Sequence, residues 1–150
     1  MSLYEMIGQM PMFRAFSEKE KKQFAKMDHT LCEFRQGDTI IKEGEPFSSI
    51  FLLVKGSVLI SKKVNETPIR LAKLRPGEIF GEMSFFSHRP RQSNVIASED
   101  VLAIKIDANF FKNAKPVIKD KIKDYFIEVL INRLDAMNES IMTISKLVRS

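Results

Sequence analysis

The chain has few of the residues that form metal centres and disulfides. Cys32 is the only cysteine, and His29 and His88 are the only histidines in 150 residues. A single cysteine excludes an internal disulfide and a thiolate cluster within one chain, so we expect Cys32 to be a small strand residue. Two histidines far apart in sequence argue against the metal sites of cupin enzymes. We therefore expect a protein that is not an enzyme and holds no metal or other resident cofactor.

The sequence also lacks a long apolar run. No stretch approaches the roughly 20 apolar residues needed to cross a bilayer, and Met1 to Gln9 lack the basic start and apolar middle of a secretion signal. We therefore expect a cytoplasmic protein without a membrane partner. Its length and its 44% hydrophobic and 29% charged content are ordinary for one soluble domain, so we expect a single domain over residues 1–150.

Charge of one sign is in modest excess. The net charge of +5 and the pI near 9.4 allow attraction to nucleic acid or to an anionic membrane. The basic residues are scattered, however, and the densest cluster comprises Lys19, Lys21, Lys22 and Lys26. Such a run is typical of a solvated helix face, so charge alone predicts neither kind of partner.

The first 28 residues predict a helical lead-in. Apolar residues follow helical spacing between Leu3 and Met12, where Pro11 would end the helix. Ser17 followed by Glu20 is the pattern of a capping box and predicts a second helix through about Met27. Residues 1–28 are therefore expected to be helical.

From residue 29 to residue 106 the pattern changes to short strands separated by turn residues. We expect strands over 30–35, 39–41, 49–54, 57–64, 67–74, 92–97 and 101–106. The segments between them are rich in Gly, Pro, Asn and Asp, which are the usual turn residues. This arrangement indicates a β-barrel or sandwich rather than alternating strands and helices.

After the last strand the sequence returns to helical patterns over residues 107–150. Asp107 can cap a short helix, and Pro116 separates it from a long one. The long helix, Val117 to Ser150, would extend about 50 Å at 1.5 Å per residue. The chain as a whole therefore predicts an α+β protein with a long C-terminal helix.

Apolar residues in the long helix repeat at alternating spacings of three and four. They are Ile127, Leu130, Leu134, Met137, Ile141, Ile144 and Val148. This is the pattern of a coiled-coil seam, and it predicts that the helix associates with a copy of itself. We expect a parallel homodimer, while Leu134 at a and Ile144 at d leave the number of helices open. The alternative is an amphipathic helix that lies on its own β region, but a helix of this length exceeds the span of a region of that size.

One stretch, from Phe80 to Val95, carries the residue types of a binding site. Gly81 lets a ligand approach the backbone, and Glu82 to Phe86 can form a helical turn whose free amides favour an anion. Arg91 can bind phosphate in a bidentate manner, whereas ionised Glu82 only accepts and suits a sugar hydroxyl. These residues predict a binding site for a ligand that carries both a phosphate and a sugar hydroxyl. A surface turn beside a solvated arginine is the alternative.

The same stretch resembles the phosphate-binding cassette of the cyclic nucleotide-binding domain family, which includes catabolite activator protein-like regulators. Phe80-Gly81-Glu82, Ser84 and Pro90-Arg91 match its pattern in register. The glycines that separate the strands also fall where the family places them, at Gly37, Gly44, Gly56, Gly77 and Gly81. The resemblance covers nearly the whole chain. It implies an antiparallel β-roll, or jelly-roll barrel, between N-terminal helices and a long C-terminal helix.

The resemblance implies a role for each cassette residue. The family's matching glutamate, here Glu82, accepts from the ribose 2′-hydroxyl, and Arg91 pairs with the cyclic phosphate. The expected ligand-binding set is Gly81, Glu82, Met83, Ser84, Arg91, Gln92 and Ser93. The ligand would be cAMP or cGMP. A hydroxyl just after the arginine helps the guanine-binding members, so Gln92 there favours cAMP, although Ser93 lies one place later; Phe85 and Phe86 are bulkier than usual.

The resemblance also bears on signalling. In the family the long helix closes over the base, so Ile122, Tyr125 and Phe126 are lid candidates, although core packing accounts for them equally well. The family's transcription factors add a DNA-reading domain that is not present in this sequence, so we expect no direct DNA binding unless the sequence is a fragment of a longer chain. The sequence predicts a non-catalytic sensor that acts through its C-terminal helix on an unknown downstream protein. A degenerate β-roll that binds no nucleotide and serves as an oligomerisation or docking module is the alternative.

Overall fold

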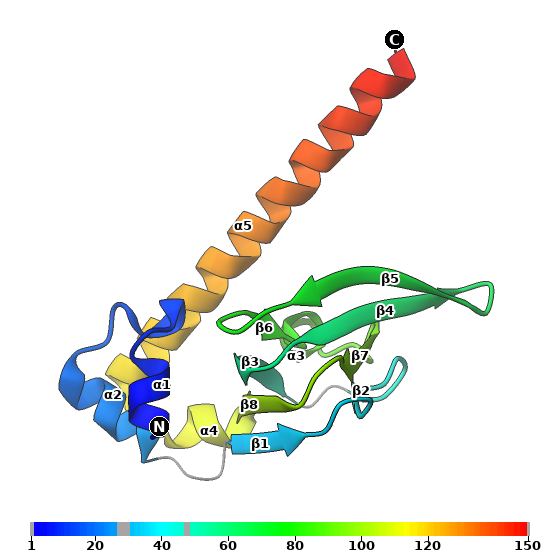
Figure 1. Cartoon of the computed structure of the whole chain (residues 1–150). Coiled ribbons are helices and arrows are strands. Elements are labelled where there is room, and N and C mark those ends of the chain that lie inside the picture. The colour runs from blue at the N-terminus through cyan, green and yellow to red at the C-terminus, as the bar shows by residue number, and fades with distance from the viewer. Residues whose placement is uncertain (1, 27–30, 47–48, 150) are drawn as a thin grey trace. The chain divides into compact units, whose positions relative to one another are not determined.

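The computed structural model describes residues 2–26, 31–46 and 49–149, and it divides into two compact units, Met1–Ala114 and Lys115–Ser150. The first unit contains α1 (Leu3–Ile7), the 3-10 turn η1 (Pro11–Phe13), α2 (Glu18–Ala25), β1 (Leu31–Phe34), β2 (Thr39–Ile41), β3 (Ile50–Lys55), β4 (Val58–Val64), β5 (Thr67–Leu74), β6 (Ile79–Phe80), α3 (Glu82–Ser87), β7 (Asn94–Ala97), β8 (Val101–Ile106) and α4 (Ala108–Asn113). The second unit is the single helix α5 (Pro116–Arg149). Figure 1 shows these elements in chain order.

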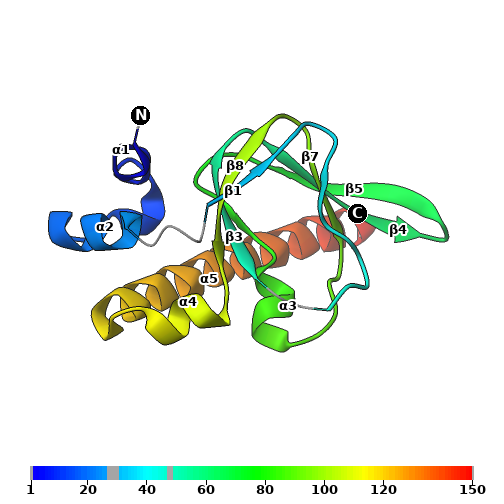
Figure 2. The ribbon, with the colours of Figure 1, turned by 90° about the horizontal axis from the view of Figure 1, so that it is seen from below.

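The strands form two four-stranded sheets in which every pairing is antiparallel. The first sheet has the order β1-β8-β3-β6 and the second has the order β2-β7-β4-β5. Figure 2 shows the β-roll from a second direction, with α3 at its lower side. The structure therefore confirms the α+β class, with an antiparallel β-roll, N-terminal helices and a long C-terminal helix.

The β-roll has its own apolar core, to which both sheets contribute. Its buried members are Ile41, Phe51, Leu53, Val58, Leu74, Phe80, Val95, Ala97, Val101 and Ala103. Phe51 and Phe80 stack with ring centroids 5.1 Å apart, which joins β3 to β6. Burying one such side chain stabilises the fold by about 1.5 to 3 kcal/mol. The end of β6, where the cassette begins, is therefore anchored firmly.

The strand predictions hold for most of the roll and fail near the cassette. β2, β5 and β8 have the predicted bounds, whereas β6 was not predicted because two residues are too few to show a period of two. β7 begins at Asn94 rather than at Gln92. The reason is that the backbone of Arg91 is hydrogen-bonded to the turn that contains Gly44 and Glu45. The Arg91 N–H donates to the Glu45 carbonyl at 2.7 Å, and the Gly44 N–H donates to the Arg91 carbonyl at 2.9 Å.

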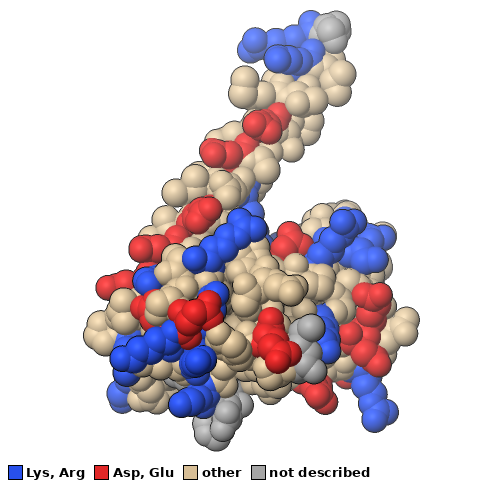
Figure 3. Space-filling view, turned by 60° about the vertical axis from the view of Figure 1, so that its left-hand side comes forward, with Lys and Arg blue, Asp and Glu red and all other residues tan. Residues whose placement is uncertain are grey.

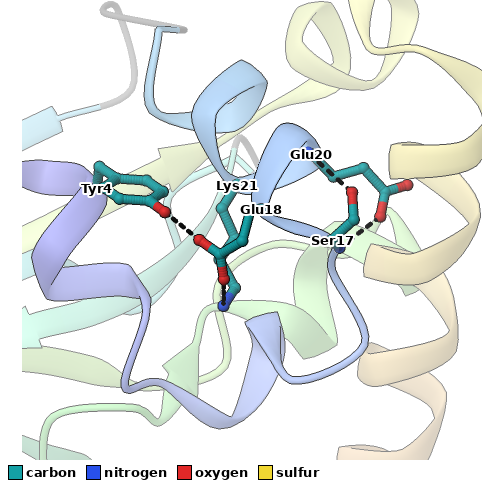
Figure 4. A network of polar contacts seen from close by, with 5 residues as sticks. All are labelled: Tyr4, Ser17, Glu18, Glu20 and Lys21. Carbon is teal, nitrogen blue, oxygen red and sulfur yellow. Dashed lines mark hydrogen bonds and ion pairs between the residues drawn. The ribbon is translucent and has the colours of Figure 1, made fainter.

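The first helix is shorter than predicted. α1 ends at Ile7, and Pro11 begins the separate turn η1 instead of ending a longer helix. Gly8 follows α1 directly, and glycine disfavours continuation of a helix. The hydroxyl of Tyr4 donates to the carboxylate of Glu18, which links α1 to α2 (Figure 4).

The capping box that begins α2 is confirmed. The Glu20 N–H donates to Ser17 Oγ at 3.1 Å, and the Ser17 N–H donates to Glu20 Oε1 at 2.7 Å (Figure 4). These bonds satisfy two amides that the start of a helix leaves free. The predictions made for Met27, His29 and Thr30 lie outside the described residues.

The C-terminal helices begin at, or within one residue of, the predicted positions. Asp107 caps α4, because its carboxylate accepts from the Phe110 N–H at 2.9 Å. α5 spans 34 residues and starts at Pro116, one residue earlier than expected, since proline is well suited to the first turn of a helix. Among the described residues, no helix combines the length and the apolar character that a membrane span requires.

Candidate functional site

The cassette helix α3 starts directly after β6, and Gly81 makes this junction possible. Gly81 has φ 82° and ψ 5°, a left-handed conformation that other residues rarely adopt. A Cβ at this position would lie 2.9 Å from both Arg91 Nη1 and the Ser49 carbonyl oxygen, and 3.1 Å from Ile41 Cδ1. Both the backbone and the available space therefore require glycine here.

Arg91 is the central side chain of the site. It is only 6% exposed. Its Nη1 donates to the Gly81 carbonyl at 2.9 Å and to Ser84 Oγ at 2.7 Å, while Nη2 donates to the Ser49 carbonyl at 2.8 Å. These bonds leave part of the guanidinium's donor capacity without a partner among the described residues. The guanidinium is therefore held in one orientation and still able to bind a ligand.

The charge on Arg91 is maintained despite burial. Burial lowers the pKa of Arg91, and the carboxylates of Glu45 and Glu82 act in the opposite sense. Because the ordinary pKa of arginine lies far above neutrality, the side chain stays protonated. A buried permanent cation is costly unless it meets negative charge or acceptors, so this site is suited to an anion.

Arg91 faces a cavity of about 300 Å³ that lies entirely within the first unit. All the residues predicted to bind a ligand line it: Gly81, Glu82, Met83, Ser84, Arg91, Gln92 and Ser93. Ile41, Ile60, Lys62, Leu71 and Val95 complete the lining. Glu82 and Ser84 are buried with Arg91. The structure thus brings a carboxylate, a hydroxyl and a guanidinium together on one wall.

The remaining cassette residues lie in different surroundings. Met83 is 60% exposed at the rim of the cavity. Gln92 is exposed, and its Nε2 donates to the Pro90 carbonyl at 3.1 Å, which occupies part of its amide. Phe85 packs away from the cavity lining, because its ring contacts those of Phe86 and Phe111 at centroid distances of 5.5 and 5.9 Å. The bulk of Phe85 therefore does not fill the cavity.

The strand residues of the lining were not predicted from the sequence. The alternation of side chains along β4 and β5 distinguishes the two faces of each strand, but it does not show which face borders a cavity. Ile60 pairs with Ala72 and Ser61 pairs with Arg70, so Leu71 is the extra residue of a β-bulge. Bulges redirect side chains, and Leu71, 57% exposed, lies on the cavity. Only the register of the two strands reveals this position.

The remaining candidate residues are His88 in the cassette loop and the three lid candidates in α5. His88 ends α3 with φ 58°, is exposed, and donates its backbone N–H to the Ser84 carbonyl at 2.9 Å. Ile122 and Phe126 are buried and Tyr125 is half-buried, all within α5, and their assignment as a lid stays a prediction. The described residues contain no group of three or more His, Cys, Asp or Glu able to hold a metal ion.

Comparison with known proteins gives a consistent result. A family model described as the cyclic nucleotide-binding domain matches residues 31–115, more than half of the chain. A cAMP-dependent protein kinase type II regulatory subunit from Drosophila melanogaster is 25% identical over 127 residues, which cover 81% of this chain and 33% of that protein. A cAMP-dependent protein kinase regulatory subunit from Aspergillus fumigatus is 28% identical over 119 residues, or 79% and 28% of the two chains. The chain therefore spans about a third of these curated relatives.

Solved structures resemble the fold over most of its length. The crystal structure of a cyclic nucleotide-binding domain from Methylobacillus flagellatus KT matches with a TM-score of 0.77. The match covers 93% of this chain and 80% of that one at 21% identity, a level that establishes the fold alone.

Proposed function

The chain belongs to the cyclic nucleotide-binding domain family, and we propose that its cavity binds a cyclic purine nucleotide, cAMP or cGMP. The observation that carries this proposal is the presence of two buried groups of opposite charge, Glu82 and Arg91, on one cavity of about 300 Å³. A roll that bound no nucleotide would have no evident need for either group, because burying a charged group is costly unless it is paired and hydrogen-bonded.

Each group suits a different part of the ligand. The guanidinium of Arg91 offers its remaining donors to the cyclic phosphate, and Ser84 and Gly81 hold it in place for that contact. The carboxylate of Glu82 only accepts, which suits the ribose 2′-hydroxyl. Apolar side chains of the second sheet, among them Ile60, offer a surface for the flat base. The ligand is thus read at its phosphate, sugar and base.

Occupancy would be relayed through the cassette helix. Phe85 of α3 contacts Phe111 of α4, and α4 leads along the chain into α5 after Ala114. A ligand that fixes α3 through Arg91 and Ser84 therefore acts on the element that precedes α5. By population shift, the ligand changes the position of α5 only as far as it prefers one position over another. The downstream protein would respond to that change, and the module itself would carry out no catalysis.

The long helix α5 would also join two copies of the chain. The predicted seam of α5 is exposed except at half-buried Leu130: Leu134 and Ile141 are 57% and 58% exposed. In Figure 3 the visible face of α5 carries uncharged side chains with Asp and Glu among them, and Lys and Arg gather at its C-terminal end. A helix face with this heptad pattern buries its apolar residues by pairing with an identical helix. We therefore propose a parallel homodimer.

Titration of the purified protein with cAMP, cGMP and AMP, followed by calorimetry, tests the binding proposal. The cyclic nucleotides should bind, and AMP, whose phosphate is not cyclic, should bind more weakly. Arg91→Ala should lower affinity by about thirty-fold to several thousand-fold, the equivalent of roughly 2 to 5 kcal/mol. Arg89→Ala is the matched control, because Arg89 is exposed in the same loop and does not line the cavity.

The outcomes separate the proposal from its alternative. A wild-type protein that binds none of these nucleotides would contradict the proposal and favour the alternative, a roll that serves as an oligomerisation or docking module. An unchanged isotherm for Arg91→Ala, in a variant whose thermal unfolding shows that it is folded, would contradict the phosphate role. Equal losses for Arg91→Ala and Arg89→Ala would also contradict it, because they would indicate a general effect of surface charge.

A further inference from the structure

A second cation lines the cavity. Lys62 on β4 is half-buried and borders the same space as Arg91 and Glu82. Within residues 2–26, 31–46 and 49–149, its ammonium group makes no hydrogen bond or ion pair. The neighbouring Lys63 is exposed and belongs to the opposite face of the strand, because side chains alternate along a β-strand. Lys62 is thus a donor directed to the cavity side of the sheet.

The contacts proposed above for Arg91 and Glu82 do not involve the charge of Lys62. The cyclic phosphate carries a single negative charge, which Arg91 meets, and Glu82 is suited to the ribose hydroxyl. An ammonium group has only donors, so any contact that it makes with the ligand is to an acceptor. The remaining part of the ligand is the base.

The position of Lys62 agrees with a contact to the base. The phosphate end of the cavity is formed by Gly81, Ser84 and Arg91, which are bonded to one another. Lys62 lies on the second sheet, two residues from Ile60 and on the same face, beside the apolar surface offered to the base. Its ammonium group can therefore meet the edge of a purine that lies on that surface.

Purines differ at this edge. Guanine presents two acceptors there, N7 and O6, whereas adenine presents the acceptor N7 beside the donor N6 amino group. A lysine pairs well with the first arrangement and poorly with the second. We propose that Lys62 is a specificity-determining residue that lets the pocket accept guanine as well as adenine. This inference rests on the proposed binding of a cyclic nucleotide and assigns the base preference of that site.

Calorimetric titration of the full chain with cAMP, cGMP and cIMP tests the inference. In Lys62→Met, which keeps a long apolar side chain, the ratio of the Kd for cGMP to the Kd for cAMP should rise about tenfold. The Kd for cIMP should follow that for cGMP, because hypoxanthine has O6 and N7 but no 2-amino group. Lys62→Arg should retain the wild-type ratio, since it restores the donors. Lys63→Met removes the same charge from the opposite face and should leave the ratio unchanged.

The result distinguishes failure of the Lys62 assignment from failure of the proposed nucleotide binding. If wild type binds these nucleotides and Lys62→Met weakens all three equally, the lysine serves the phosphate and the inference is wrong. An unchanged ratio with unchanged affinities would likewise overturn it, since Lys62 would then be a solvated side chain. If wild type binds none of the three, the proposed function itself fails, and the assignment of Lys62 fails with it.

Discussion

Arg91 Nη1 donates a hydrogen bond to Ser84 Oγ at 2.7 Å, and this bond ties the segment before β7 to the helix α3. Both side chains are buried, so water does not replace the bond readily. A hydrogen bond to a charged group contributes about 1.5 to 3 kcal/mol of stabilising free energy, which is lost when one partner is removed. A ligand that binds the guanidinium therefore also acts on α3 through Ser84.

Ser84→Ala should weaken cAMP binding about tenfold, because the guanidinium loses one of the bonds that orient it. The loss should be smaller than that of Arg91→Ala, since the charge remains. Calorimetry measures both. Ser87→Ala is the control: Ser87 lies on the same helix, is exposed, and its hydroxyl accepts only a long bond of 3.3 Å from the Arg89 N–H. Wild-type affinity for Ser84→Ala would show that the bond does not matter for the ligand.

Glu82→Gln should cost less affinity than Arg91→Ala, because the amide oxygen still accepts a hydrogen bond from the ribose hydroxyl. The comparison of cAMP with 2′-deoxy-cAMP isolates this contact. Wild type should prefer cAMP, and the variant should show a smaller preference. Glu66→Gln, in the exposed turn between β4 and β5, is the matched control and should keep the wild-type preference. A preference that survives in Glu82→Gln would assign the hydroxyl to another residue.

Gly81→Ala should destabilise the fold and reduce nucleotide affinity. The left-handed backbone costs a non-glycine residue roughly 1 to 2 kcal/mol, and the new Cβ would lie 2.9 Å from the Ser49 carbonyl oxygen, which is backbone and cannot turn aside. Gly8→Ala is the control, because Gly8 has φ −58° and a Cβ there meets nothing closer than 3.6 Å. Thermal unfolding should show a loss of stability for the first variant only. Equal stabilities would contradict the strain argument.

The site could be predicted from the sequence where its chemistry is local. Gly81, Glu82 and Arg91 form a short pattern, and the structure brings all three to one cavity, while their role in binding a ligand stays a prediction. Ser17 and Glu20 likewise form the predicted capping box, because both bonds span only three residues. Features that depend on neighbouring residue types can thus be inferred without coordinates.

The parts that depend on pairing between distant segments could not be predicted. Leu71 and Lys62 border the cavity only because β4 and β5 pair in a particular register with one bulge. β7 starts late because Arg91 bonds the turn at Glu45, a residue more than forty positions away. Sequence periodicity describes each strand by itself, so it contains no information about these partners.

Cys32 should react slowly with alkylating reagents. Burial raises the pKa of the Cys32 thiol, and Lys105 acts in the opposite sense with a smaller effect. A raised pKa leaves less thiolate at a given pH, and the thiolate is the reactive form. The rate of reaction with iodoacetamide near pH 8 should therefore be lower than that of free cysteine. The increase of this rate with pH should occur at a higher pH than for free cysteine.

Two controls apply to this measurement. Unfolding in guanidinium chloride removes burial and should restore the rate of free cysteine. Lys105→Met removes the opposing charge and should slow the reaction of the folded protein further. A native rate equal to that of free cysteine would show that Cys32 is not shielded by the fold.

The last prediction concerns the seam of α5. Wild-type protein should have about twice the chain mass of 17.3 kDa by size-exclusion chromatography with light scattering at micromolar concentration. Leu134→Glu combined with Ile141→Glu should give monomers, because both residues occupy a positions and like charges would face each other across the seam. These monomers should still bind cAMP, since every residue that lines the cavity belongs to the first unit.

Ala136→Glu combined with Thr143→Glu is the matched control. It adds the same charge to the same helix, but both residues occupy c positions, away from the a and d residues of the seam. This variant should remain dimeric, which separates the seam from a general effect of charge on α5. If both double variants become monomeric, repulsion along the helix rather than the seam controls association. A wild-type protein that is monomeric at micromolar concentration would refute the homodimer, while the binding proposal would stand on its own titration.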